Sequence, residues 1–94
     1  MKEVPAIVRY GRALIDYYTE PEYRAALRRA FGDHGADFIT LDDNPRGQKF
    51  LAACVAWAMS VGILFCSATA DDGQSVVSSF RLTDKGRTEI LDNG

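Results

Sequence analysis

The fold is decided by residues 62–87, which read GILFCSATADDGQSVVSSFRLTDKGR. β-Branched, aromatic and small residues fill Ile63–Thr69 and Val76–Leu82, and an Asp-Gly turn signal stands between them. This pattern predicts a β-hairpin with an exposed tip at Asp71–Ser75. The second strand alternates, as a strand with one solvated face requires. One face gathers Val76, Ser78, Phe80 and Leu82, and the other gathers Val77, Ser79 and Arg81.

A short helix is predicted after the hairpin. Thr83 is a suitable N-cap, and Asp84 complements the helix dipole. Gly86 permits close packing of the helix against the hairpin. This last helix carries Ile90 and Leu91.

An uncharged run, Phe50–Ala70, precedes and enters the hairpin and is long enough to span a bilayer. Its composition changes at Gly62 from alanine-rich to β-branched and aromatic. The change favours a buried helix followed by a strand over a membrane anchor. Trp57 lies on the same helical stripe as Phe50 and Cys54, so we expect it to be buried.

Helix signals also mark the rest of the chain. Asp43 or Asn44 as cap and Pro45 in the first turn predict a third helix that runs to about Val61. Before it, helical spacing predicts a first helix over about Pro5–Tyr18. Thr19-Glu20-Pro21-Glu22 starts a second helix that Gly32 ends. Residues 37–41 fit either one helical turn or a short strand.

These elements predict an α+β fold in which helices precede a two-stranded hairpin and a short C-terminal helix. The order, together with Phe80-Arg81-Leu82-Thr83-Asp84-Lys85-Gly86-Arg87, resembles the winged-helix domain of small bacterial regulators of the MarR and PadR type. The resemblance covers about half the chain. Since the chain has 94 residues, of which 47% are hydrophobic, residues 1–94 are expected to form a single winged-helix-like domain.

The resemblance implies that the helix before the wing enters the DNA major groove. Arg46, Gln48 and Lys49 at its start are residue types that contact base edges and phosphates. A basic stripe of Arg24, Arg28 and Arg29 on the second helix is a further candidate, with a merely solvated helix face as the plainer interpretation.

Two features depart from the DNA-binding pattern. Beyond Lys49, the outward face of the third helix would consist of small residues (Ala52, Ala53, Ala56 and Ser60), which suits a protein surface at least as well as DNA. The wing tip carries Asp71 and Asp72, which repel a phosphate backbone. These two acids are therefore candidate contacts with a protein partner.

The sequence offers no convincing catalytic group. His34 lies in a glycine-flanked turn beside Asp33, which is typical of exposed loop polarity rather than of a general base. Cys54 and Cys66 have no histidine near them, so neither a zinc site nor any other cofactor is expected. Both cysteines are expected to be free packing residues in a cytoplasmic protein.

Two functions stay open from the sequence. The first is a small DNA-binding transcriptional regulator. The second is a winged-helix-like module that binds a protein, such as a phage-encoded, anti-CRISPR-like inhibitor of a host nucleic-acid complex. The net charge of −2 agrees with the second, although residues 1–31 hold six basic and four acidic side chains. Tyr17 or Tyr18 is a further candidate contact, with homodimerisation as the alternative use.

Overall fold

Strand pairing organises the second half of the molecule. The computed structural model describes residues 5–43 and 47–92. In it, strands β2 (Leu64–Asp71) and β3 (Val76–Leu82) form an antiparallel hairpin, and β1 (Ile39–Asp42) pairs with the other edge of β3. The predicted hairpin and its exposed tip are confirmed. The ambiguous segment at 37–41 is resolved as a strand, so the sheet formed by the described residues has three strands in the order β1-β3-β2.

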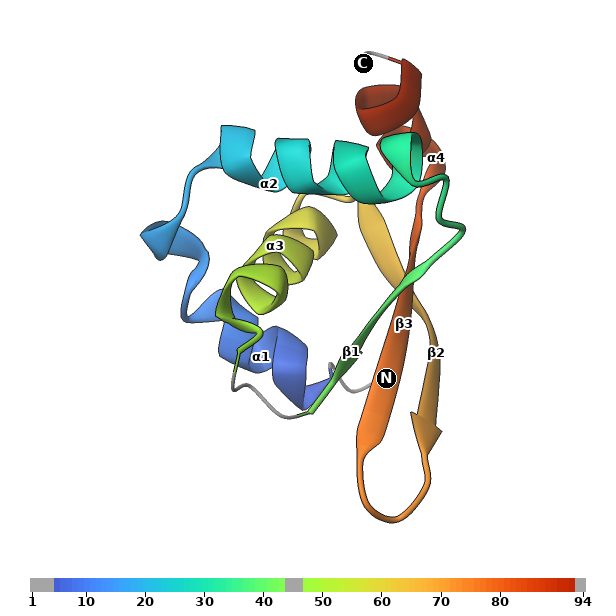
Figure 1. Cartoon of the computed structure of the whole chain (residues 1–94). Helices are drawn as coiled ribbons and strands as arrows, with labels where there is room; N and C mark the ends of the chain where they lie inside the picture. The colour runs from blue at the N-terminus through green and yellow to red at the C-terminus, as the bar shows by residue number, and fades with distance from the viewer. Residues whose placement is uncertain (1–4, 44–46, 93–94) are drawn as a thin grey trace.

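Most of the helices lie on one face of this sheet (Figure 1). Among the described residues, four are α-helical: α1 (Ala6–Arg12), α2 (Glu20–Leu27), α3 (Lys49–Ser60) and α4 (Asp84–Gly86). The same part of the chain holds three further helical segments: η1 (Ile15–Tyr17), η2 (Arg28–Asp33), which extends α2, and η3 (Arg87–Asp92), which extends α4. Helix α4 and η3 lie at one end of the sheet, and the hairpin tip extends from the other end. The chain is a compact α+β domain.

Three helix boundaries differ from the prediction, one of them the end of the second helix, which continues through Gly32 in η2 to Asp33. Helix α1 ends at Arg12, and the 3₁₀ turn η1 replaces the predicted continuation towards Tyr18. Helix α3 begins at Lys49 rather than near Asp43, because Gly47 takes a φ of 77°, which a right-handed helix does not accommodate. The predicted cap Asn44 and Pro45 lie outside the described residues. Helix α2 starts as predicted, with a complete capping box between Thr19 and Glu22.

Helix α3 lies in the core. Every residue of Ala52–Ala58 is buried, so the prediction of an outward face made of Ala52, Ala53 and Ala56 is wrong. The physical reason is the small size of alanine, which lets neighbouring elements close around the helix. Helix α1 approaches so closely that a Cβ added to Gly11 would overlap the carbonyl group of Ala52.

Aromatic rings fix helix α2 against α3. Tyr23 stacks on Trp57 with ring centroids 5.4 Å apart, and on Phe50 at 5.8 Å. The Tyr23 hydroxyl donates a 2.6 Å hydrogen bond to the backbone carbonyl of Ile15. Removal from water raises the pKa of Tyr23 above its ordinary value. Trp57 is buried, as its place on the helical stripe predicted.

The C-terminal helix closes the domain as expected. Thr83 Oγ1 accepts a 2.9 Å hydrogen bond from the amide of Gly86. A Cβ on Gly86 would overlap the carbonyl group of Ile63, so glycine is required where the helix crosses the start of the hairpin. The uncharged run Phe50–Ala70 is divided between α3 and β2. Within residues 5–43 and 47–92, no helix has the length and apolar character needed to cross a membrane.

Candidate binding surface

The residues proposed to contact DNA at the head of α3 are differently placed. Gln48 is half-buried and donates a 2.6 Å hydrogen bond from Nε2 to Oδ1 of Asp42. Lys49 is exposed to solvent. Arg46 lies outside the described residues. Beyond Lys49 the helix turns its side chains into the core up to Ala58, apart from Phe50, which is half-buried, and Leu51, which is 44% exposed.

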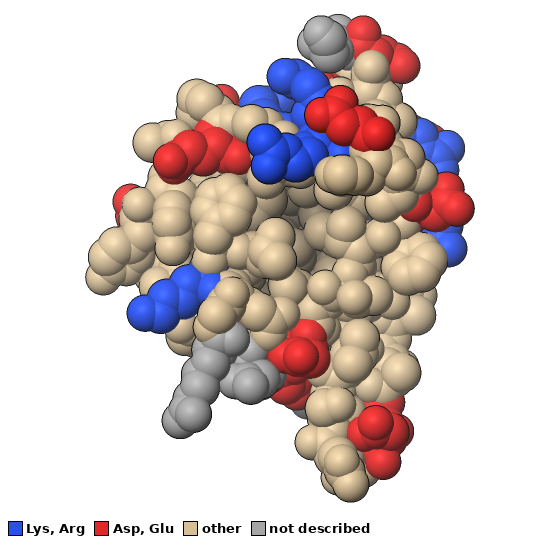
Figure 2. Space-filling view, viewed as in Figure 1, with Lys and Arg blue, Asp and Glu red and all other residues tan. Residues whose placement is uncertain are grey.

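The three arginines of the predicted stripe lie in different environments. Arg24 lies over the Trp57 ring, and its Nη2 atom lies 3.0 Å from Oε1 of Glu89. It therefore ties α2 to η3. Arg28 and Arg29 remain exposed on η2. On the face shown in Figure 2, basic side chains over α2 have acidic side chains beside them, rather than forming a continuous basic stripe.

The hairpin tip is acidic and tightly turned. The Asp71 carboxylate accepts a 2.9 Å hydrogen bond from the amide of Gly73, and Asp72 accepts two from the amides of Gln74 and Ser75, also at 2.9 Å. The bonds from Ser75 and Gln74 lower the pKa of Asp72. Both acids are exposed, so the tip presents negative charge at neutral pH.

Groups suited to metal binding do not converge in the part of the chain that is described. His34 is exposed in its turn. No three His, Cys, Asp or Glu side chains of the described residues lie close enough together to hold a metal ion. Both cysteines are free, and burial raises the pKa of Cys54 to about 12. That thiol is protonated at neutral pH.

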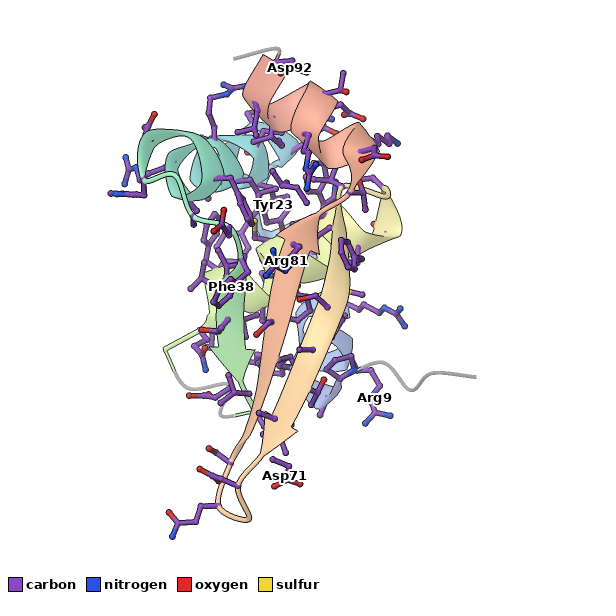
Figure 3. The ribbon with its side chains drawn as sticks, turned by 90° about the vertical axis from the view of Figure 1, so that its right-hand side faces the viewer. Arg9, Tyr23, Phe38, Asp71, Arg81 and Asp92 are labelled. Carbon is purple, nitrogen blue, oxygen red and sulfur yellow. The ribbon has the colours of Figure 1, made fainter. Side chains whose placement is uncertain are left out.

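The uncovered face of the sheet carries an aromatic and cationic row. Phe65 of β2 pairs directly with Arg81 of β3. Because Ile39 pairs with Phe80, the next residue outward, Phe38, falls opposite Arg81 on its other side. The Arg81 guanidinium lies 5.5 Å from the centre of the Phe38 ring, and Figure 3 shows the two on the open face. We call Phe38, Arg81 and Phe65 the outer row.

The side chains of the outer row are exposed together as one group, rather than scattered singly over the surface. Phe38 is 47% exposed and Phe65 is 43% exposed. Beside them, Leu91 of η3 is 42% exposed. A hollow of about 230 Å³ lies between the row and the C-terminal helix. It is lined by Phe31, Ala36, Asp37, Phe65, Arg81, Leu82, Arg87 and Leu91.

The sequence pattern did not single out this surface. Alternation in β3 correctly placed Arg81 on the solvated face, but an isolated arginine there is unremarkable. The row becomes visible only when the register brings Phe65 and Phe38 to the two sides of Arg81.

Of the two candidate tyrosines, Tyr17 is the exposed one. Its exposed fraction is 77%, whereas Tyr18 packs edge-on against Phe50 with ring centroids 5.1 Å apart.

Comparison with known proteins adds no relative: no family model, curated protein or solved structure matches this chain. The geometry of the outer row and of the hollow beside it is therefore the basis for assigning a function.

Proposed function

We propose that this chain is a non-catalytic, winged-helix-like module that binds a protein through the outer face of its sheet. The observation that carries the proposal is the outer row, in which two half-exposed phenylalanines flank an arginine. Aromatic residues and arginine are the types enriched at the energetic centres of protein interfaces. A module with these residues on an open sheet face has the means to bind a protein surface.

The disposition of α3 supports protein rather than DNA as the partner. A recognition helix in the major groove presents several side chains to the bases. Here Ala52–Ala58 is buried under α1, α2 and the sheet, and Gln48 bonds to Asp42. In a helix-turn-helix, a short turn joins two successive helices, whereas β1 separates η2 from α3 in this chain.

The acidic tip supports the same choice. A winged-helix hairpin that follows DNA lies against phosphates, and Asp71 and Asp72 oppose that approach. A net charge of −2 gives no general attraction to nucleic acid. Binding to a protein does not require the tip to be free of negative charge.

The test is affinity capture from an extract of the cells in which the chain occurs, with and without nuclease treatment. The Phe38→Ala/Phe65→Ala variant is compared with Leu51→Ala, which removes an exposed apolar side chain elsewhere, on α3. We expect a protein to be retained by the wild type and by Leu51→Ala, to be lost from the double variant, and to resist nuclease. Retention that nuclease abolishes would contradict the proposal.

The second candidate, a DNA-binding regulator, is favoured by the exposed cations Arg28, Arg29 and Lys49. It predicts that Lys49→Ala and Arg46→Ala each weaken binding and lower the salt slope by about one. Under our proposal the wild type instead shows only weak attraction to duplex DNA at ~50 mM salt, with a dissociation constant on the order of 10⁻⁴ M or poorer. A direct titration separates the two.

A further inference from the structure

The hollow beside the outer row combines two arginines with apolar walls. Arg81 comes from β3 and Arg87 from η3, and both line the hollow. Neither guanidinium forms an ion pair or hydrogen bond with any residue of 5–43 or 47–92. Glu89, two residues after Arg87 in η3, is engaged by Arg24 at 3.0 Å and by Lys85 at 3.7 Å.

From this arrangement we infer that the hollow binds an acidic side chain of a partner protein, next to an apolar side chain of the same segment. The inference rests on the proposed function and gives it a location and a partner chemistry. The partner's carboxylate binds between Arg81 and Arg87. Its apolar neighbour packs on Phe65 and Leu91.

Charge complementarity argues for the carboxylate. A planar guanidinium binds a carboxylate through two parallel hydrogen bonds, which gives both strength and direction. Arg81 is held in place for this contact, because the Phe38 ring lies against its guanidinium and Phe65 is its neighbour across the strands. A side chain that is already ordered loses less conformational entropy on binding.

The apolar walls argue for the adjoining apolar side chain. Phe31, Leu82 and Leu91 line the hollow together with Phe65. Leu91 and Phe65 are 42% and 43% exposed, so covering them removes apolar area from water. An inorganic anion or a free carboxylate leaves this area uncovered and gains only the ionic contacts.

Acidic groups nearby argue for a single carboxylate rather than a nucleic-acid backbone. Asp37 lines the same hollow, and Asp71 and Asp72 lie at the far end of the same hairpin. A nucleic acid carries closely spaced phosphates that these acids repel. One carboxylate placed between two arginines meets a net favourable charge even with Asp37 on the rim.

The experiment selects ligands from a displayed library of random twelve-residue peptides, using the whole chain as bait. We expect the enriched peptides to carry an acid within one or two positions of an aromatic or aliphatic residue. Synthetic versions of these peptides should bind Arg81→Gln and Arg87→Gln each about tenfold more weakly than the wild type. Replacing the acid of the peptide by its amide should give a similar loss, and binding should weaken at high salt.

The matched control is Arg9→Gln, which makes the same charge change at an exposed position of α1, and Figure 3 shows Arg9 well away from Arg81. It should leave peptide affinity unchanged. Asp37→Asn should strengthen binding by about threefold, because it removes a like charge beside the bound acid. Melting curves of all the variants check that each one folds.

Distinct outcomes overturn the inference and the function on which it rests. The inference would be overturned by enriched peptides that are basic, or by peptides that bind Arg81→Gln and Arg87→Gln as tightly as the wild type. The chain would then still bind a protein, but through another part of its surface. A failure to enrich any peptide would also overturn the inference. If, in addition, the chain binds duplex DNA or a single-stranded oligonucleotide and Arg81→Gln weakens that binding, the proposed function fails as well.

Discussion

Helix α3 and the outer face of the sheet both carry apolar side chains, yet they lie in opposite environments. Ala52–Ala58 is buried along its whole length, whereas Phe38 and Phe65 are 47% and 43% exposed. A helix that is apolar on every side belongs in a core. A strand keeps one face for the core and one for solvent, so apolar groups on the solvated face stay available for a partner. Stability and binding are thus expected to depend on different residues.

The largest difference between the two regions should come from their aromatic side chains. Trp57→Ala in α3 removes a buried ring that stacks on Tyr23, and it should lower the free energy of unfolding by roughly 3 to 5 kcal/mol. Phe65→Ala on the outer face should cost about 1 kcal/mol or less, because the ring is already half in water. Urea unfolding followed by far-ultraviolet circular dichroism measures both. Similar losses in the two variants would contradict the division between core and binding face.

A smaller loss of stability should follow from adding a side chain where the backbones of α1 and α3 touch. Gly11→Ala places a methyl group against the carbonyl of Ala52, and displacing one helix should cost about 1 to 3 kcal/mol. That loss outweighs the gain in helix propensity that alanine brings. Thermal and urea unfolding give the change in stability.

Gly32→Ala is the matched control for this substitution. The atoms nearest to its added Cβ are 3.8 Å away, which is ordinary contact distance, and Gly32 lacks a positive φ. It should therefore be neutral or slightly stabilising. A Gly11→Ala variant that is as stable as Gly32→Ala would show that α1 does not lie directly on α3.

Much of the fold was predictable, because local patterns determine it. Alternation in Val76–Leu82, the Asp-Gly turn and the Thr83 cap each act over a few residues, and all three predictions are confirmed. The environment of α3 was not predictable from one helical stripe. Its alanines fit either a surface or a core, and the choice depends on α1, whose Gly11 lies far away in the sequence.

The candidate surface was less predictable than the fold. Arg81 and Phe65 are separated by the whole hairpin, and Phe38 precedes a strand that the sequence left undecided. Only the pairing registers of β1 and β2 with β3 bring these side chains into one row. The sequence pattern instead offered Arg24 as a candidate contact or as part of a solvated helix face, since it could not show that Glu89 lies within 3.0 Å of it.

The smallest expected difference in stability is the one between alanine substitutions of two arginines, Arg24 and Arg81. Arg24→Ala removes the ion pair with Glu89 and the contact of the guanidinium with the Trp57 ring, and it should lower the free energy of unfolding by about 1 kcal/mol. Arg81→Ala removes only an exposed contact with Phe38, for which about 0.5 kcal/mol is expected.

A double-mutant cycle of Arg24→Ala with Glu89→Ala isolates the ion pair from the contact with Trp57. The coupling energy should decrease as salt is raised, because both side chains are partly in water. The loss of stability that Arg24→Ala still causes in the Glu89→Ala background reports the packing of Arg24 on Trp57. A coupling energy of zero at low salt would mean that Arg24 is as free as Arg81, and α2 would then regain the basic stripe on which the DNA-binding alternative depends.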